Sequence, residues 1–88
     1  MTRVRAKARV IHTSTSRGGV LLDPASKAYF ELNATGDRLW KAIAEPASIP
    51  ELVALLVGEH GVAQDRAEAD VKAWVAELRA AELLDEVP

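Results

Sequence analysis

The chain of 88 residues contains no cysteine, and it has only two histidines, two tryptophans, one tyrosine and one phenylalanine. Without cysteine it can form no disulfide scaffold, no thiolate metal site and no cysteine nucleophile. His12 and His60 stand in no metal-ligand spacing, and the Gly18-Gly19 pair lacks the lysine and the serine or threonine of a phosphate-binding loop. We therefore expect no catalytic residues, no metal and no cofactor, and we do not expect an enzyme.

Long hydrophobic runs are missing as well. The longest, Leu52–Val57, is far shorter than the about 20 apolar residues that a membrane-spanning helix needs. The N-terminal residues alternate between basic and apolar side chains and lack the hydrophobic segment of a signal peptide. We expect a soluble, cytoplasmic protein that has no membrane partner.

The net charge of −2 conceals an uneven distribution along the chain. Residues 1–27 hold six basic side chains and one acidic side chain, whereas residues 28–88 hold five basic and twelve acidic side chains. Affinity for nucleic acids comes largely from clustered lysine and arginine, which the acidic part lacks. We therefore expect no nucleic-acid partner, and a winged-helix DNA-binding regulator remains only a less favoured alternative.

The first third of the chain has the pattern of β-strands. Residues 3–10 alternate basic and apolar side chains, which predicts a strand with one solvated and one buried face. A polar loop is expected over residues 12–19, a short second strand over 20–22, and a turn over 23–26. Residues 27–32 then form the third strand. The short connections favour one antiparallel sheet of three strands.

Two helices follow this sheet. Asn33 is a suitable N-cap for a helix over residues 34–44, which has an apolar stripe. Ser48, followed three residues later by a glutamate, has the pattern of a capping box and opens a second helix. This helix is expected to end at Gly58 or Gly61, because glycine is common just after the last helical turn.

A third helix is predicted over residues 66–81, where apolar side chains recur every three or four positions. The tail at residues 83–85 is expected to fold back onto the core. The order βββααα predicts an α+β fold that resembles a winged helix-turn-helix, with a three-stranded antiparallel sheet followed by three helices. No linker or repeat is visible, so we expect residues 1–88 to form a single domain.

The few aromatic side chains carry the most information about function. Phe30 and Trp40 are expected in the core, whereas Trp74 on the third helix belongs either to the core or to a groove beside the third strand. Tyr29 faces the opposite way to Phe30 on that strand. If the third strand is an open edge of the sheet, its unpaired N–H and C=O groups and the third helix form a slot for an extended peptide.

Several segments resemble the PqqD-like family, whose members are peptide-recognition domains of pathways that modify ribosomally made peptides. The resemblance is carried by Gly19–Asp23, Tyr29–Gly36 and Leu39–Trp40, and later by Ala69–Leu78 and Leu83–Leu84. The Asn-Ala-Thr-Gly junction and the Leu-Leu-Asp turn are most similar to the small stand-alone proteins of lasso-peptide pathways.

The resemblance implies a protein that binds the leader segment of a precursor peptide and performs no chemistry itself. The leader would be added as a strand to the third strand, beside the third helix, and delivered to a separate leader peptidase, a transglutaminase-like cysteine protease, and then to a cyclase. A peptide chaperone for a radical SAM enzyme or for another such pathway is the alternative. Carried onto this chain, the implied peptide-binding residues are Ala28, Tyr29, Phe30, Glu31 and Leu32 on the strand, Val71, Trp74, Val75 and Leu78 on the helix, and Asp70 and Lys72 at the rim.

Overall fold

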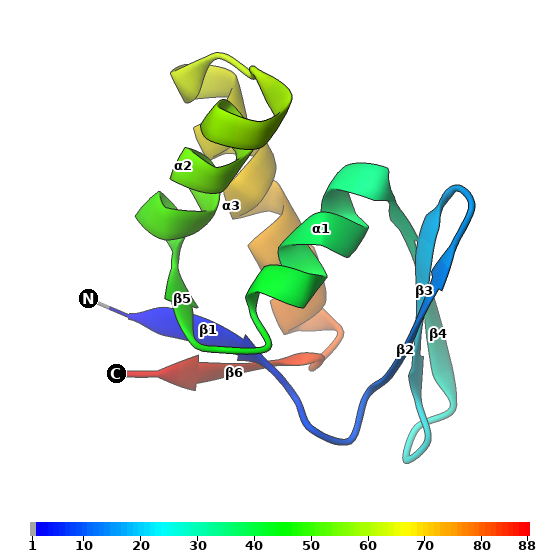
Figure 1. The fold of residues 1–88 in the computed structure, drawn as a ribbon. Helices are drawn as coiled ribbons and strands as arrows, with labels where there is room; N and C mark the ends of the chain where they lie inside the picture. Colours follow the sequence, from blue (N-terminus) through cyan, green and yellow to red (C-terminus); the bar gives the residue numbers. More distant parts are fainter. Residues whose placement is uncertain (1) are drawn as a thin grey trace.

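The computed structural model describes residues 2–88. The fold has three helices, α1 (Ala34–Ala42), α2 (Ile49–His60) and α3 (Gln64–Ala80), and two three-stranded sheets; α1 packs against one sheet, and α2 and α3 lie over the other (Figure 1). This arrangement confirms the predicted α+β, winged helix-turn-helix-like fold, but the expectation of one sheet is wrong because the strands form two. No helix within residues 2–88 has the length and the apolar character needed to cross a bilayer.

The first sheet, here called the terminal sheet, joins both ends of the chain. Its central strand is β1 (Arg3–Ala6), which pairs antiparallel with β5 (Ala47–Ser48) and with β6 (Leu84–Val87). The predicted alternation holds within β1, where Val4 is buried and its neighbours are exposed. The predicted strand over residues 3–10 is too long, because the chain leaves the sheet after Ala6.

The second sheet, here called the hairpin sheet, has the order β2-β3-β4. Its strands are β2 (Ile11–Thr15), β3 (Gly18–Asp23) and β4 (Ala28–Asn33), and all neighbours are antiparallel. The predicted polar loop over residues 12–19 is therefore wrong, because it forms β2 and the start of β3. Strand β2 has little apolar alternation because it is a largely exposed edge. The predicted third strand is β4, which forms the other edge.

The helix boundaries follow from the local signals in the sequence. Asn33 Oδ1 accepts a hydrogen bond from the Gly36 N–H at 2.7 Å, which caps α1. Ser48 forms the predicted capping box at the start of α2, and α2 ends at Gly61, whose φ of 64° lies in the left-handed region that glycine adopts at low cost. Helix α3 starts at Gln64, slightly before the predicted position, and its N-cap residue, Ala63, has no side chain that could accept a hydrogen bond.

The core lies where the three helices meet the two sheets. The terminal sheet contributes Val4 and Leu84, and the hairpin sheet contributes Leu21 and Leu32, all less than 10% exposed. The tail folds back as predicted, because β6 pairs with β1. The remaining apolar core side chains come from the helices and their connections: Leu39, Trp40, Ile43, Ala47, Leu52, Val53, Leu56, Ala67, Val71, Val75, Leu78 and Leu83.

Candidate functional site

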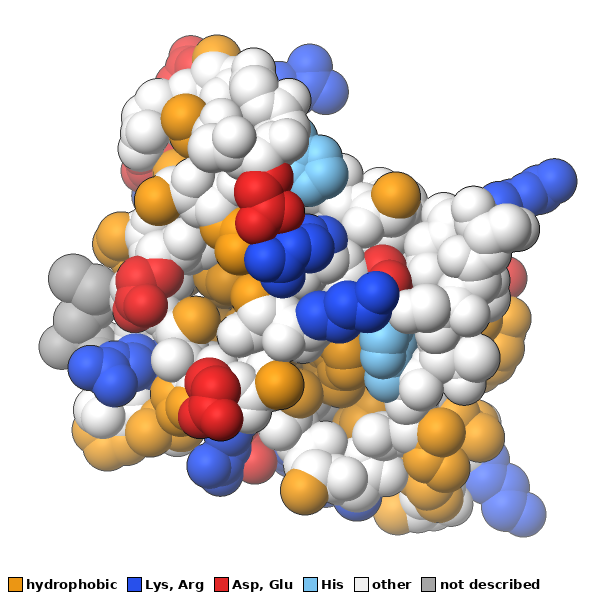
Figure 2. Space-filling view, viewed as in Figure 1, with side chains coloured by type: hydrophobic (Ala, Val, Ile, Leu, Met, Phe, Trp, Pro, Cys, Tyr) orange, Lys and Arg blue, Asp and Glu red, His pale blue; other side chains and the backbone are white. Residues whose placement is uncertain are grey.

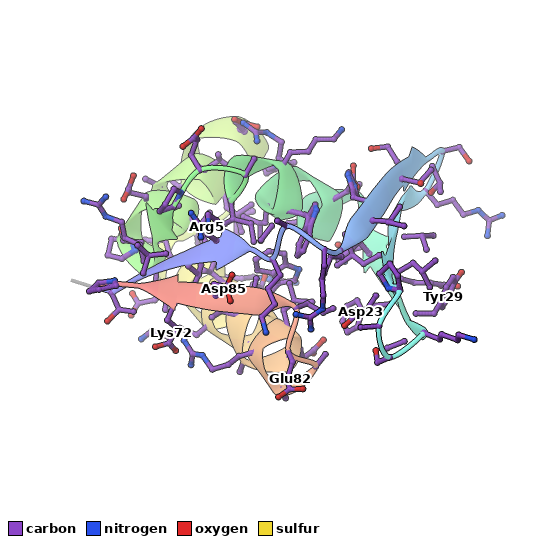
Figure 3. The ribbon with its side chains drawn as sticks, turned by 90° about the horizontal axis from the view of Figure 1, so that it is seen from below. Arg5, Asp23, Tyr29, Lys72, Glu82 and Asp85 are labelled. Atoms are coloured by element: carbon purple, nitrogen blue, oxygen red, sulfur yellow. The ribbon has the colours of Figure 1, made fainter. Side chains whose placement is uncertain are left out.

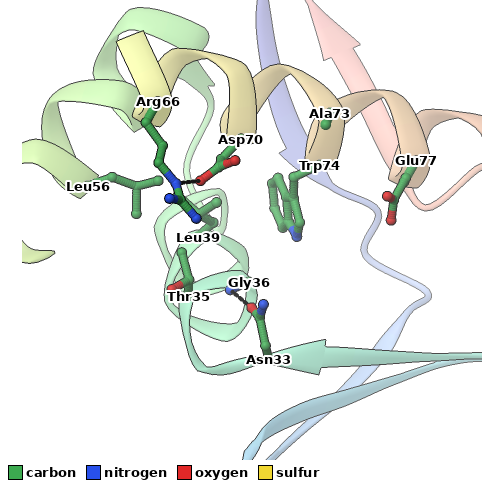
Figure 4. Close-up of a pocket in the computed structure, with 10 residues that line it drawn as sticks. All are labelled: Asn33, Thr35, Gly36, Leu39, Leu56, Arg66, Asp70, Ala73, Trp74 and Glu77. Atoms are coloured by element: carbon green, nitrogen blue, oxygen red, sulfur yellow. Dashed lines mark hydrogen bonds and ion pairs between the residues drawn. The ribbon is translucent and has the colours of Figure 1, made fainter. Parts of the chain in front are cut away.

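A groove lies between α3 on one side and the end of β4 with the start of α1 on the other (Figure 4). It consists of a cavity of about 470 Å³ and an adjoining one of about 110 Å³ at β4. The larger cavity is lined by Asn33, Thr35, Gly36, Leu39, Leu56, Arg66, Asp70, Ala73, Trp74 and Glu77. The smaller cavity is lined by Phe30, Glu31, Leu32, Asn33, Gly36, Trp74 and Glu77.

Helix α3 presents two neighbouring stripes of side chains, and only one of them faces the groove. Side chains three or four positions apart lie on the same face of a helix. The groove stripe is Arg66, Asp70, Ala73, Trp74 and Glu77. The core stripe, displaced by one residue, is Ala67, Val71, Val75 and Leu78, each at most 1% exposed.

Trp74 belongs to both the groove and the margin of the core. Its side chain is half-buried and packs against the core cluster while it lines both cavities. The indole Nε1 is fully buried and has no hydrogen-bond partner among residues 2–88. A Cβ at Gly36 would lie 3.1 Å from this nitrogen, so glycine leaves room for the ring. An unsatisfied buried donor costs about 1–3 kcal/mol, which makes Trp74 an unusual residue in this wall.

Strand β4 forms the other wall, and within residues 2–88 it pairs with another strand only on its β3 side. Along β4, Phe30 and Leu32 point inward, whereas Tyr29 and Glu31 are exposed. Tyr29 is 61% exposed and projects away from the helices (Figure 3). Its hydroxyl donates a hydrogen bond of 3.3 Å to Glu31 Oε1. A strand edge of this kind leaves N–H and C=O groups free for a further strand.

The structure brings together about half of the predicted site residues. Phe30, Glu31 and Leu32 line the smaller cavity, Asp70 lines the larger one, and Trp74 lines both. Two further predicted residues, Ala28 and Tyr29, lie on the same strand outside these cavities.

The other four predicted residues lie elsewhere on α3. The side chains of Val71, Val75 and Leu78 belong to the core stripe, so they do not line the groove. Lys72 lies on a different face of α3, where its Nζ donates to Glu68 Oε1 at 2.9 Å. Each step along a helix turns the side chain by about 100°. A residue one position away from the groove stripe therefore points away from the groove.

The sequence reasoning did not select several residues that line the groove. Three of them, Arg66, Ala73 and Glu77, stand three or four residues from a selected residue on α3, and this spacing is the signal that could have identified them. The others lie at the β4–α1 junction or on a second helix, and only the tertiary fold brings them to α3: Asn33, Thr35, Gly36, Leu39 and Leu56.

The charged side chains along the groove form an ion pair at one end and, within the described part of the chain, none at the other. At one end, the Arg66 guanidinium lies 3.7 Å from the Asp70 carboxylate (Figure 4). At the other end, Glu31 and Glu77 have no ion pair with any of residues 2–88. No three His, Asp or Glu side chains within these residues are grouped so that they could hold a metal ion.

A buried carboxylate fixes the hairpin sheet against α1 and so sets the position of β4. Asp37, which is 6% exposed, accepts hydrogen bonds from His12 Nε2 and from Ser14 Oγ at 3.0 Å, and Lys41 Nζ lies 3.3 Å away. Burial alone would raise the pKa of Asp37, but the hydrogen bonds from these three partners outweigh it and lower that pKa. A Cβ at Gly19 would lie only 2.1 Å from Asp37 Oδ1, so this close approach requires glycine.

The sequence model of the family described as Coenzyme PQQ synthesis protein D (PqqD) matches residues 18–84 of the chain. No curated protein sequence matches it significantly. These matched residues include β3, β4, all three helices and the whole groove.

Solved structures give the same fold. A structure described as TbiB1 in complex with the TbiA(beta) leader peptide has a TM-score of 0.82 and 27% identity, over 92% of this chain and 94% of that one. A lasso peptide synthetase B1 complexed with the leader peptide has a TM-score of 0.77 and 27% identity, over 97% and 98%. The PqqD part of Methylobacterium extorquens PqqCD, a stand-alone recognition element, has a TM-score of 0.77 over 94% and 88%; at 19% identity this likeness supports the fold alone.

Proposed function

The chain belongs to the family of coenzyme PQQ synthesis protein D (PqqD), and from this membership we propose that it binds the leader segment of a ribosomally made precursor peptide without catalysing a reaction itself. The membership confirms the resemblance predicted from the sequence. In this proposal, residues 1–88 act as one recognition domain, and chemistry is left to separate enzymes.

The observation that carries the proposal is the position of the free edge of β4 beside the groove wall of α3. An extended peptide can add to such an edge through main-chain hydrogen bonds, while pockets beside the edge select its side chains. We propose Ala28, Tyr29, Phe30, Glu31 and Leu32 as the strand that receives the leader.

The helical wall of the proposed site consists of Asp70, Trp74 and their neighbours in the groove stripe. Val71, Val75 and Leu78 would support this wall from the core side, because their own side chains are buried. Two solved relatives at 27% identity are complexes with leader peptides, which supports the same kind of ligand here.

We place the protein in a lasso-peptide pathway. This finer assignment is supported by the lasso peptide synthetase B1 structure, which covers almost the full length of both chains. The bound precursor would be handed to a separate leader peptidase, a transglutaminase-like cysteine protease, and then to a cyclase. Binding would act by raising the effective concentration of the cleavage site at the peptidase.

A second candidate is a peptide chaperone in another modification pathway, such as one served by a radical SAM enzyme. The description of the matched family, a protein of coenzyme PQQ synthesis, favours it. Both candidates require the same groove, and they differ in the precursor. The neighbouring genes would distinguish them: a short precursor gene beside peptidase and cyclase genes supports the lasso pathway, whereas a radical SAM enzyme gene supports the alternative.

Nuclear magnetic resonance tests leader binding directly. The synthetic leader of the precursor encoded beside this gene would be titrated into the labelled protein, and amide shifts would be followed for every residue. We expect shifts along residues 28–33 and along the groove stripe of α3. Shifts confined to the terminal sheet, or no shifts at a millimolar concentration of leader, would contradict the proposal.

A further inference from the structure

Two acidic residues line the smaller cavity of the groove from opposite walls. Glu31 comes from β4 and Glu77 comes from α3, and both side chains are exposed. Glu31 accepts a hydrogen bond from the neutral Tyr29 hydroxyl, and Glu77 has no hydrogen-bond partner among residues 2–88. The cavity therefore carries two negative charges that the described part of the chain leaves without a cation.

Most of the other charged side chains of α3 form ion pairs; Asp65 has none within residues 2–88, and its Oδ1 accepts a hydrogen bond from the Arg66 N–H. Asp70 pairs with Arg66 and Glu68 pairs with Lys72, each four residues away, and Arg79 reaches Glu86 on β6. The positions four residues before and after Glu77 are alanines, Ala73 and Ala81. Helix α3 thus provides no partner for Glu77 at the spacing where one would pair.

Trp74 lines the same cavity as the two carboxylates. Indole rings attract ammonium and guanidinium groups through the electron density of the ring face, and they pack against the aliphatic stems of lysine and arginine. Two unpaired carboxylates and an indole in one small cavity together match the chemistry of a long basic side chain.

We propose that this cavity selects a leader segment with a lysine or arginine at the position between Glu31 and Glu77. The inference rests on the proposed function and deepens it, because it adds a charge requirement to the apolar groove. The requirement applies to one position only, since the Arg66–Asp70 pair makes the far end of the groove electrically balanced. An acidic leader side chain in the cavity would be repelled by both carboxylates.

A peptide selection tests this charge requirement with random sequences in place of the leader. A random 12-residue peptide library displayed on phage would be panned against the immobilised wild-type protein and against the double variant Glu31→Gln/Glu77→Gln. We expect apolar residues at spaced positions in both selections, and lysine or arginine at one fixed position in the wild-type selection only. Glu68→Gln, on another face of α3, is the matched control and should keep the basic position.

The outcomes separate this inference from the proposed function. If no peptide is enriched on the wild type, leader binding itself is contradicted. If peptides with apolar anchors are enriched but no position favours a basic residue, or if the double variant keeps that preference, then only the charge requirement is overturned.

A charge exchange measures the size of the effect. The selected peptide, and the same peptide with its basic residue changed to glutamate, would be titrated against the wild type and Glu77→Lys by fluorescence anisotropy. For a solvated pair we expect each single change to weaken binding about three- to tenfold. The double change should recover most of the loss, and the difference should shrink as salt is raised. Equal losses with no recovery would overturn the proposal.

Discussion

The two sheets of this protein each have three strands, but they differ in how the strands are paired and covered. In the terminal sheet, β1 is paired on both sides and its buried Val4 packs into the core. In the hairpin sheet, β4 is an edge strand, and the exposed large apolar side chains of residues 2–88, which are Ile11, Leu22 and Tyr29, all lie here. The comparison shows that the terminal sheet is closed around its central strand, whereas the hairpin sheet leaves an edge and apolar side chains exposed.

The three exposed large apolar side chains of the hairpin sheet lie in one row across its strands. Ile11 pairs in register with Leu22, and Leu22 pairs with Tyr29. Figure 2 shows apolar side chains gathered over the lower part of this sheet, whereas charges of both signs are scattered over the helices. The hairpin sheet is thus covered on one face only, and its position depends on the contacts that join it to α1.

The largest expected effect comes from breaking the attachment of the hairpin sheet. Gly19→Val places a side chain where Asp37 Oδ1 now lies, so it separates β3 from α1 and disrupts the buried hydrogen bonds. We expect a loss of about 3 kcal/mol in the free energy of unfolding, measured by urea denaturation. Gly58→Ala is the control, because a Cβ there meets nothing within 4 Å, and it should stabilise α2 by about 0.5–1 kcal/mol. A smaller loss in Gly19→Val than about 1 kcal/mol would mean that the sheet is held by other contacts.

A second substitution compares the groove and core stripes of α3. Trp74→Ala should weaken leader binding at least tenfold, or about 1.4 kcal/mol, because it removes the main aromatic surface of the groove. It should also lower stability, because Trp74 packs against the core. Val75→Ala is the matched control: it lowers stability through a cavity in the core and should leave the affinity of the folded protein nearly unchanged. Equal affinity loss in both variants would remove the distinction between the two stripes.

The pH dependence of stability should identify the role of Asp37. Because the pKa of Asp37 is lowered in the folded chain, its carboxylate stabilises the fold at pH values above its unfolded pKa of about 3.9. This contribution is lost as the pH falls through the lower, folded-state pKa, so stability should decline below about pH 5. Asp23 adds to this decline in the same direction, since hydrogen bonds from Arg9 lower its pKa.

Asp37→Asn separates the two contributions. The variant should lose about 1–2 kcal/mol at neutral pH, because the amide replaces a charge-assisted acceptor. Its stability should then fall less steeply between pH 5 and pH 2 than that of the wild type, as followed by urea denaturation at each pH. An unchanged slope would show that Asp37 does not contribute to the acid sensitivity.

The smallest effect is expected on the outer face of the hairpin sheet. Tyr29→Thr should change the free energy of unfolding by less than about 0.5 kcal/mol, since the side chain is largely exposed and threonine suits a strand. Leu32→Ala, on the inner side of the same strand, should cost about 2–4 kcal/mol. Urea denaturation of both variants measures the two changes in the free energy of unfolding, and their difference shows how unequally the two faces of β4 contribute to stability.

Those features that depend on local chemistry were predicted from the sequence. Asn33 and Ser48 cap α1 and α2 because their side chains satisfy backbone N–H groups within three residues. Strand β4 followed from a clear alternation of side chains, whereas its edge position was only a condition until the strand order was known. Strand β2 was missed because it is polar on both faces, and the pairing of β1 with β6 was missed because it joins opposite ends of the chain.

For the candidate site, the sequence identified the strand and the helix that form the groove, but not which face of the helix lines it. Trp74 could be placed on an apolar helix face, but the choice between core and groove depends on which face of α3 meets α2 and which meets β4. That rotation is set by packing between distant segments, so a shift of one residue moved Val71, Val75 and Leu78 out of the predicted site. The electrostatic character of the groove, carried by Glu31 and Glu77, also required the tertiary fold.

The pairing of β1 with β6 brings the two ends of the chain together. Arg3 lies opposite Val87 in the ladder, and both termini leave the molecule on the side away from the hairpin sheet (Figure 1). A tag, a surface linker or a second protein fused at either end would therefore emerge at the same place, clear of β4. This geometry makes the fold suitable as a fusion module, in which an enzyme can be attached at either terminus without obstructing the groove.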